Sequence, residues 1–594
     1  METKLLMGNE AIAMGAIAAG VQMVAGYPGT PSTEVLETIA KNRTEDIYVE
    51  WSVNEKAAME VGIGAAYAGA RTLITMKQVG LNVASDPLMC VNYIGVKGGL
   101  VILVADDPGP ISSQTEQDTR HFAKYSHIPV FDPSSVEEAY ILMRTAFEIS
   151  EKYHTPVIFR PTTRVCHACA SVELSLERQA KPIEGFVKDN KWVIFPPLAY
   201  KNHSAMAAKH AQIAEEFAGL AYNRVQGQGT KGVVFSGASG AGGQEILAGL
   251  DAEVKTLQLV TPYPFPEKLL LSFLDGVEEV LVVEELDSVI EQSLLELCGR
   301  HGLSLNVKGK LTGELPVAGE YTYELLEAAL TEYATGQALV KPACAQPPKL
   351  PVRPPVLCAG CPHRASFYAV KRAMAGVKSV FSGDIGCYTL GNAQPLDMTD
   401  TCLCMGAGLT IAQGLQHVEP SVKHFGFIGD STFFASGLTG VVNSVYNQAD
   451  VTFIILDNST TAMTGHQPHP GTGVTMMGDV SQKVSIKAVL EAIGVECVLT
   501  ADPLDLSEAI PAVQKAAAHQ GPSAVIFVSP CAAIVKPQAR CTVTTDCIGC
   551  RTCIDEIGCP ALSIPGGQVR IDPGLCTGCG LCTQICPVEA IVKG

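Results

Sequence analysis

Short apolar runs alternate with longer segments rich in small residues through the first 195 positions. The runs have the length of buried strands, are bounded by polar or turn residues, and cover 47–51, 71–76 and 100–105. The longer segments between them have helical length and lie at 9–25, 34–42 and 54–70. This alternation predicts a parallel sheet with helices on both faces, which is an α/β fold.

Two later regions repeat this rhythm and are separated by a proline-rich segment. The first has a helical segment at 204–225 and strand-like runs at 233–235 and 281–285. The second has strand-like runs at 425–428 and 451–456, with a helical segment between them at 433–446. Six prolines within 341–355 predict a semi-rigid linker at the boundary. The predicted domains are therefore 1–195, 196–345, 346–537 and a cysteine-rich tail, 538–594.

Composition narrows the class of protein. The 594 residues are 47% hydrophobic and 17% charged, which is typical of compact folded domains. A net charge of −18 argues against nucleic acid as a partner. The N-terminal residues lack the pattern of a secretory signal, and no apolar run is long enough to span a bilayer. The 21 cysteines then indicate metal binding rather than disulfides, and we expect a cytoplasmic protein with no membrane partner.

The strongest chemical pattern is a pair of cysteine runs in the tail, each ending in Cys-Pro. The first run is Cys547, Cys550, Cys553 and Cys559, and the second is Cys576, Cys579, Cys582 and Cys586. This resembles the two-cluster bacterial ferredoxin pattern, in which the last cysteine of each run ligates the other cluster. The resemblance implies one 4Fe-4S cluster on Cys547, Cys550, Cys553 and Cys586 and another on Cys559, Cys576, Cys579 and Cys582. The first run departs by two extra residues before Cys559, and zinc, the alternative, is disfavoured by eight cysteines in this pattern.

Polar residues follow two strand-like runs in the third region. Gly429, Asp430 and Ser431 come after one run, and Asn458 comes after the next. The carboxylate and amide oxygens suit Mg²⁺, and a glycine at the start of a helix suits a diphosphate. The pattern resembles the Gly-Asp-Gly and Asn motif of thiamin diphosphate enzymes, with Ser431 in place of the last glycine. That resemblance implies a backbone carbonyl at Thr460 as a further Mg²⁺ ligand, whereas an ordinary βαβ unit with an aspartate in its turn is the alternative.

Thiamin enzymes also need a carboxyl group that hydrogen-bonds the aminopyrimidine ring and so activates the cofactor. The first region resembles the pyrimidine-binding domain of 2-oxoacid:ferredoxin oxidoreductases, which implies Glu55 in this role because it follows a strand and opens a helix. Glu50 and Glu60 are the other candidates for this role. The alternative for Glu55 is a purely structural one, a glutamate in the first turn of a helix that the helix dipole favours. The middle region resembles the transketolase C-terminal type of domain.

The same resemblance implies further residues near substrate and cofactor. Thr30 would bind the substrate carboxylate or ketone, and Arg120 would supply the cation that a 2-oxoacid needs. Residues that would face the cofactor or diphosphate are Gly386, Cys387, His466 and the segment from Lys77 to Gly80. A third, proximal 4Fe-4S cluster is implied on Cys358, Cys361, Cys387 and Cys531. The alternatives are surface loops for Arg120 and His466 and buried small residues for the four cysteines.

The whole chain resembles the large, or alpha, subunit of the indolepyruvate:ferredoxin oxidoreductase family. The start from Gly8 to Ala13 and the Cys358-x-Gly-Cys-Pro-His-Arg entry narrow the match to it. The resemblance implies oxidative decarboxylation of indolepyruvate, phenylpyruvate and hydroxyphenylpyruvate to arylacetyl-CoA and CO₂, with electrons passed to ferredoxin. It implies thiamin diphosphate, Mg²⁺ and two or three 4Fe-4S clusters, a smaller beta subunit, and a hetero-oligomer such as a dimer of alpha-beta pairs. Three alternatives are the same chemistry on pyruvate or another aliphatic 2-oxoacid, a non-catalytic electron-transfer subunit, and a non-oxidative decarboxylase.

Overall fold

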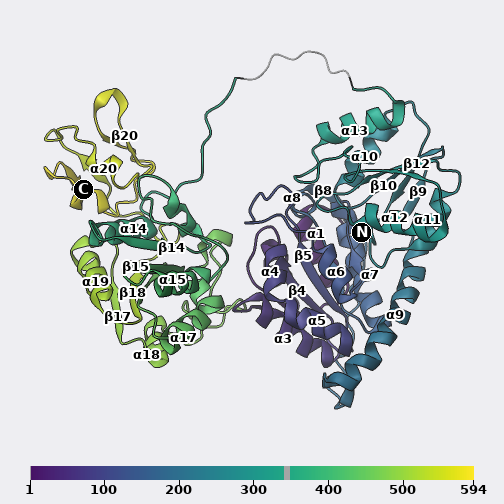
Figure 1. Cartoon of the computed structure of the whole chain (residues 1–594), viewed down its shortest axis with the longest axis horizontal. Coiled ribbons are helices and arrows are strands. Elements are labelled where there is room, and N and C mark those ends of the chain that lie inside the picture. The colour runs from purple at the N-terminus through teal and green to yellow at the C-terminus, as the bar shows by residue number, and fades with distance from the viewer. Residues whose placement is uncertain (1, 340–347) are drawn as a thin grey trace. The chain divides into compact units, whose positions relative to one another are not determined.

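The computed structural model describes residues 2–339 and 348–594 and divides the chain into two compact units, Met1–Gln346 and Pro347–Gly594 (Figure 1). The predicted boundary at 345 and positions 341–347 of the proline-rich segment lie outside the described residues. Among the described residues, no helix combines the length and the apolar character needed to cross a bilayer.

The first unit contains a six-stranded, fully parallel sheet in the order β3-β2-β4-β5-β7-β6. Its strands are β2 (Met23–Gly26), β3 (Tyr48–Trp51), β4 (Thr72–Lys77), β5 (Leu100–Ala105), β6 (Val130–Phe131) and β7 (Val157–Phe159). The helices around it are α1 (Gly8–Ala18), α2 (Thr33–Asn42), α3 (Glu55–Tyr67), α4 (Gln78–Val83), α5 (Ser85–Ile94), α6 (Arg120–Ser126) and α7 (Val136–Tyr153). Alternate residues of β4 face α3, because Ile74 and Met76 share one buried cluster with Met59 and Ile63. The predicted α/β fold is confirmed.

The helix predicted over 9–25 is too long. Helix α1 ends at Ala18, and the apolar residues that follow belong to strand β2. The break is at Gly20, which has a φ of +77° and lies so close to the backbone of Gln179 that an added Cβ would be 2.2 Å from its carbonyl oxygen. Only glycine fits that turn, and the continuous apolar pattern from helix to strand concealed it.

A second sheet of the first unit is mixed, in the order β13-β12-β10-β11-β9 with β9 antiparallel to β11. Its elements are α9 (Pro196–Ala218), β9 (Arg224–Gln226), β10 (Lys231–Phe235), α10 (Ser239–Ala248), β11 (Val254–Gln258), α11 (Glu267–Leu274), β12 (Glu279–Val283), α12 (Val289–His301), β13 (Asn306–Lys308) and α13 (Tyr323–Thr335). Helix α9 begins eight residues before the predicted start at 204 because Pro196 and Pro197 occupy its first turn, where no amide donor is needed. An antiparallel pair, β1 (Glu2–Met7) with β8 (Cys169–Leu174), and the short helix α8 (Thr163–His167) complete the unit.

The second unit is built on a parallel sheet in the order β14-β15-β16-β18-β17. Its strands are β14 (Ser379–Ser382), β15 (Lys423–Gly429), β16 (Val451–Asp457), β17 (Cys497–Ala501) and β18 (Ser523–Val528). Its helices are α14 (Pro362–Ala373), α15 (Ala407–Val418), α16 (Asp430–Thr432), α17 (Leu438–Tyr446), α18 (Ile486–Ile493) and α19 (Leu506–Ala518), and a π turn, Phe433–Gly437, precedes α17. The predicted strands at 425–428 and 451–456 fall inside β15 and β16.

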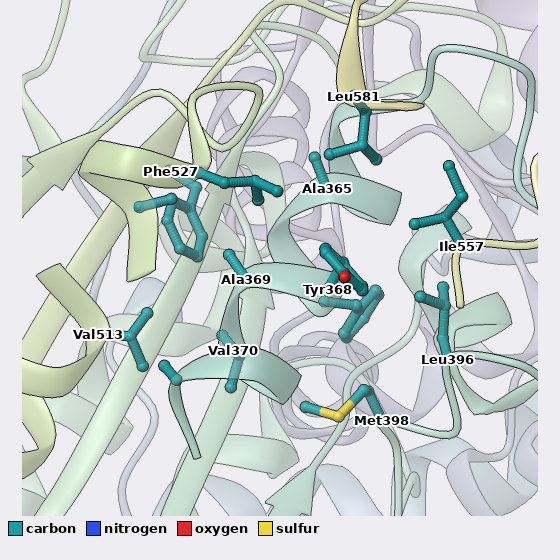
Figure 2. Packing of buried hydrophobic residues seen from close by; sticks show 14 of the residues in the cluster. Ala365, Tyr368, Ala369, Val370, Leu396, Met398, Val513, Phe527, Ile557 and Leu581 are labelled. Carbon is teal, nitrogen blue, oxygen red and sulfur yellow. The ribbon is translucent and has the colours of Figure 1, made fainter. Parts of the chain in front are cut away.

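The cysteine-rich tail shares the core of the second unit. It contains the pairs β19 (Cys541–Val543) with β22 (Ile591–Lys593) and β20 (Leu562–Ser563) with β21 (Arg570–Ile571), and the short helices α20 (Thr552–Asp555) and α21 (Leu581–Gln584). Figure 2 shows Ala365 and Tyr368 of α14 in the same apolar cluster as Ile557 and Leu581 of the tail. The tail is therefore packed on the parallel-sheet domain through α14.

Candidate active site and redox centres

The carboxyl ends of β15 and β16 bring the predicted Mg²⁺ ligands together. The strands are adjacent and parallel, with Gly429 opposite Leu456, so Asp430 and Asn458 emerge at the same edge of the sheet. Asp430 is 3% exposed, and Asn458 and Thr460 are each 5% exposed. The Thr460 amide donates to Asn458 Oδ1 at 3.3 Å, which holds the turn after β16.

Two buried histidines complete this edge of the sheet. His469 Nε2 lies 3.1 Å from Asp430 Oδ2, and Asn458 Nδ2 donates to His363 Nε2 at 3.1 Å. Burial lowers the pKa of His363 to about 4, so it is neutral and can accept that bond. Burial, and then the nearby charge of Asp430, raise the pKa of Asp457 to about 6. Oxygen donors at a place where two acidic groups repel each other fit a hard divalent cation such as Mg²⁺.

The glycines at this edge pack against one aromatic ring. An added Cβ at Gly429 would lie 2.5 Å from Cε1 of Tyr388, and one at Gly386 would lie 2.5 Å from its Cζ. The Tyr388 hydroxyl donates to Asp384 Oδ2 at 3.0 Å and lies 3.1 Å from Thr432 Oγ1. Burial raises the pKa of Asp384 to about 7. The Tyr388 ring thus fills the space that a side chain at either glycine would need, so only glycine fits next to these strand ends.

The loop after β16 holds two histidines in different surroundings, and the role predicted for His466 stays a prediction. His466 is exposed, whereas His469, three residues later, is 8% exposed and contacts Asp430. Ser431, which replaces the usual glycine, accepts a hydrogen bond from Thr461 Oγ1 at 3.0 Å. The sequence signal for His469 was a second histidine in the same polar loop, and the pattern alone did not distinguish the two.

In the first unit, Glu55 is the buried member of the three candidate glutamates. It opens α3, where Asn54 caps the helix by accepting from the Ala57 amide at 2.8 Å. Glu60, in contrast, is exposed and paired with Lys56, and Glu50 accepts from Ser52 Oγ at 2.7 Å. Burial raises the pKa of Glu55 to about 7, against a smaller lowering by its backbone and by Lys77. A proton on this carboxyl near neutral pH is what a hydrogen bond to a ring nitrogen requires.

Thr30 and Lys77 lie at the same edge of the first sheet as Glu55. Lys77 ends β4, and Gly80, just after it, packs so closely that an added Cβ would be 2.6 Å from Glu55 Oε1. Ser112 connects the two residues, because its Oγ donates to the Thr30 carbonyl at 3.1 Å and its own carbonyl accepts from Lys77 Nζ at 3.4 Å. Burial lowers the pKa of Lys77, although Asp107 and Glu55 oppose this. Lys77 is therefore a partly buried cation beside the turn that carries Thr30.

The substrate-binding role predicted for Arg120 stays a prediction, and the side chain already has several buried partners. Its side chain is fully buried, with Nε bonded to Asp118 at 2.9 Å and Nη1 to Glu284 at 2.7 Å. Nη2 donates to the Glu285 and Asp287 carbonyls at 2.9 and 3.0 Å. Nη1 and Nη2 join α6 to the second sheet, because Glu284 follows β12, whereas Nε bonds the nearby Asp118.

Replacing Arg120 by methionine is expected to destabilise the first unit by about 3–5 kcal/mol, because two buried carboxylates lose their partner. Both tryptophans, Trp51 and Trp192, belong to this unit, so urea unfolding followed by tryptophan fluorescence reports on it selectively. The control is Arg178→Met, which breaks the partly exposed pair with Asp46 and should cost less than about 1 kcal/mol. Lost activity in Arg120→Met, with stability equal to that of the control, would favour the substrate-binding role over a structural one.

The tail groups its cysteines as the crossed ferredoxin pattern requires. Burial, and then the neighbouring Cys550, Cys586 and Cys547, raise the pKa of Cys553 to about 11. A separate cavity is lined by Cys559, Cys576, Cys579 and Cys582. In each case the last cysteine of one run joins the other run. Within the described residues, no three metal-binding side chains lie at coordination distance from one point. The fit to a cluster therefore rests on the cavity and on the sulfur donors that line it.

The four cysteines assigned to a proximal cluster are also neighbours. Burial, followed by the charges of Cys531 and Cys358, raises the pKa of Cys387. The Cys361 amide donates to the Cys358 carbonyl at 3.2 Å, and the Cys531 amide donates to the Asn458 carbonyl at 3.0 Å. This set of thiols therefore adjoins the strand edge that carries Asp430 and Asn458. Soft sulfur donors beside oxygen donors suit a redox centre next to a Mg²⁺ site.

Comparisons with known proteins agree with this division of the chain. Residues 14–213 match the family described as pyruvate flavodoxin/ferredoxin oxidoreductase, thiamine diP-binding. Residues 384–527 match the thiamine pyrophosphate enzyme C-terminal TPP binding domain, and residues 569–592 match the 4Fe-4S binding domain.

Near full-length relatives carry a single name. The chain is 40% identical over 613 residues to indolepyruvate oxidoreductase subunit IorA of Archaeoglobus fulgidus, covering 99% of this chain and 97% of that protein. It is 41% identical over 602 residues to the subunit of the same name from Methanothermobacter thermautotrophicus, covering 99% and 96%. A solved 2-oxoglutarate:ferredoxin oxidoreductase from Magnetococcus marinus matches at a TM-score of 0.44 and 17% identity over 56% of this chain and 65% of that one.

Proposed function

Because the chain belongs to the indolepyruvate oxidoreductase subunit IorA family of 2-oxoacid:ferredoxin oxidoreductases, we propose that its substrates are aryl pyruvates. The reaction is oxidative decarboxylation of indolepyruvate, phenylpyruvate or hydroxyphenylpyruvate to the arylacetyl-CoA and CO₂, with electrons passed to ferredoxin. The observation that carries the proposal is the near full-length likeness to subunits of that name. It is supported by the second unit, in which the residues predicted to bind the diphosphate follow β15 and β16 and the cysteine-rich tail has the ferredoxin pattern.

The residues of each unit have separate tasks in this proposal. Glu55, protonated near neutral pH, shares its proton with the aminopyrimidine ring, and Lys77 takes the place of Arg120 as the cation for the substrate carboxylate, with Thr30 beside it. Asp430, Asn458 and the Thr460 carbonyl hold Mg²⁺, while the buried glycine edge admits the diphosphate. Thiamin diphosphate, when bound, supplies the electron sink for loss of CO₂.

The substrate class is tested by comparing phenylpyruvate with pyruvate in an anaerobic assay with CoA and a reducible dye, using the chain expressed with its partner subunit. We expect kcat/KM for phenylpyruvate to exceed that for pyruvate by roughly tenfold or more, as an apolar pocket can provide. Equal values or a preference for pyruvate would favour the aliphatic alternative. Aldehyde formed without acceptor would indicate a non-oxidative decarboxylase, and cluster-containing protein that never retains thiamin diphosphate would indicate an electron-transfer subunit.

The partners in this proposal are a smaller beta subunit and a ferredoxin, in a dimer of alpha-beta pairs in the cytoplasm. The support for a partner subunit is that the relatives are themselves named as subunits. The support for ferredoxin is the match of 569–592 to a 4Fe-4S domain.

The number of clusters is predicted to be three. Iron and acid-labile sulfide in anaerobically purified protein should then reach about twelve per chain, because the proximal thiols adjoin the Mg²⁺ edge and would form a third 4Fe-4S centre. The double variant Cys387→Ser with Cys531→Ser should fall to about eight irons. About eight irons in the unmodified protein would confine the clusters to the tail, and zinc without sulfide would contradict the redox assignment altogether.

A further inference from the structure

Helix α14 meets the tail through a loop that is longer than the ferredoxin pattern requires. Five residues, 554–558, separate Cys553 from Cys559, where the second run has three before its last cysteine. The Arg364 side chain on α14 donates from Nη1 to the Ile557 carbonyl at 2.6 Å and to the Gly558 carbonyl at 2.9 Å. The extended loop thus provides the two carbonyls that receive this arginine, immediately before Cys559.

In the part of the chain that the structure describes, no carboxylate forms an ion pair with Arg364. The residue is 4% exposed, and its Nη2 donates to the Leu357 carbonyl. Carbonyl dipoles satisfy hydrogen bonds, but they do not neutralise a buried charge, which is costly without a counter-charge. A buried guanidinium held this way is expected to lie close to negative charge of some other kind.

Several cysteines line the cavity that Arg364 also lines. Arg364 lines the same cavity as Cys559, Cys576, Cys579 and Cys582, and its buried Nε has no hydrogen-bond partner among the described residues. Cys361, three residues earlier on the chain, lines that cavity too. Burial lowers the pKa of Arg364, and negative charge at Cys559, Cys361 and Cys358 counteracts this. Four thiolates around an iron–sulfur centre would supply the missing counter-charge and an acceptor for the Nε hydrogen.

We propose that Arg364 is a positioning residue that raises the reduction potential of the cluster bound by Cys559, Cys576, Cys579 and Cys582. The potential of the tail cluster on Cys547, Cys550, Cys553 and Cys586 does not depend on it. The proposal rests on the proposed function in that it takes the tail to carry two clusters. Reduction adds one electron and no proton to that centre, so a nearby fixed positive charge stabilises the reduced form. Charge and hydrogen bonds to sulfur are recognised means of tuning such potentials.

The test is a potentiometric titration of anaerobically purified protein followed by electron paramagnetic resonance, with Arg364→Met, Arg364→Lys and Arg372→Met. Arg372 lies on the same helix but is half-exposed, with its Nη1 3.6 Å from Glu556, and serves as the matched control. In Arg364→Met we expect the reduction equilibrium of one cluster to fall by about tenfold, which is about 59 mV for a one-electron couple. The tail cluster on Cys547, Cys550, Cys553 and Cys586, and every cluster in Arg372→Met, should keep its potential.

The outcomes separate this proposal from the proposed function. Unchanged potentials in an iron-replete Arg364→Met protein, or equal shifts of the two tail clusters, would overturn the role of Arg364 while leaving the cofactor assignment intact. Unmodified protein without iron and sulfide would instead overturn the cofactors. If Arg364→Met does not retain its iron, Arg364→Lys decides: with the charge kept, an unshifted potential supports the proposal, and a tenfold fall contradicts it.

Discussion

Glu55→Gln is expected to lower kcat for 2-oxoacid oxidation by about 10²- to 10⁴-fold, the range that one general acid–base group contributes. The substitution keeps the volume and burial of the side chain but removes the proton that Glu55 holds near neutral pH. Cluster content and the electron paramagnetic resonance spectrum should not change, since every cysteine assigned to a cluster belongs to the other unit. The measurement is steady-state turnover of phenylpyruvate with CoA and dye, with iron quantified in the same sample.

A stability measurement shows whether the loss is chemical. The folded chain keeps the Glu55 proton up to about pH 7, whereas the unfolded chain releases it near the ordinary value of 4.5. The wild-type protein therefore loses stability as pH rises between these two values, and the glutamine variant does not. Glu55→Gln should become progressively more stable than wild type across this window, as read by tryptophan fluorescence in urea. A variant that is inactive and also less stable at pH 8 would show a packing role instead.

The control for this prediction is Glu60→Gln. Glu60 lies on the same helix, is exposed, and pairs with Lys56, so its loss should change turnover by less than about twofold, as for a surface ion pair. Equal loss of turnover in both variants would contradict the assignment of Glu55.

The sequence was informative where the site residues are set by local features of the chain. Strand runs, the residues directly after them, and cysteines at fixed spacing are local properties, and parallel strands bring their carboxyl ends to one edge whatever the details. Asp430 and Asn458 are 28 positions apart yet meet because β15 and β16 are neighbours. The same reasoning favoured Glu55, since a residue between a strand and a helix must lie at that edge.

The sequence could not show the environment of a polar side chain where that environment depends on distant contacts. Arg120 is two positions from Asp118 but 164 positions from Glu284, and no local pattern reveals the second contact. His466 and His469 share one loop, and the path of that loop, not its composition, turns His469 toward Asp430. The two extra residues before Cys559 were read only as a departure, because their partner Arg364 lies nearly 200 positions earlier.

Asp430→Asn is expected to weaken binding of thiamin diphosphate in the presence of Mg²⁺ by more than about 100-fold, above the 10–100-fold cost of losing an outer-shell partner of a metal. The substitution removes the one carboxylate among the three proposed ligands and leaves Asn458 and Thr460 in place. Equilibrium titration of the chain, freed of cofactor by chelation, measures the affinity. Higher Mg²⁺ should restore part of it, because the defect lies in the metal site.

Asp450→Asn is the matched control, since Asp450 precedes β16 but is partly exposed and pairs with Lys423 at 3.4 Å. It should bind the cofactor as the wild-type chain does, and equal weakening in the two variants would contradict the proposed ligand set. Asp430→Asn should not unfold the chain, because Asp430 raises the pKa of Asp457 and is therefore a source of repulsion when no cation is bound. If Asp430 serves to bind the metal, the variant should lose cofactor affinity, while the stability of the cofactor-free protein stays the same or increases. The reason is that a binding site is often strained when its ligand is absent.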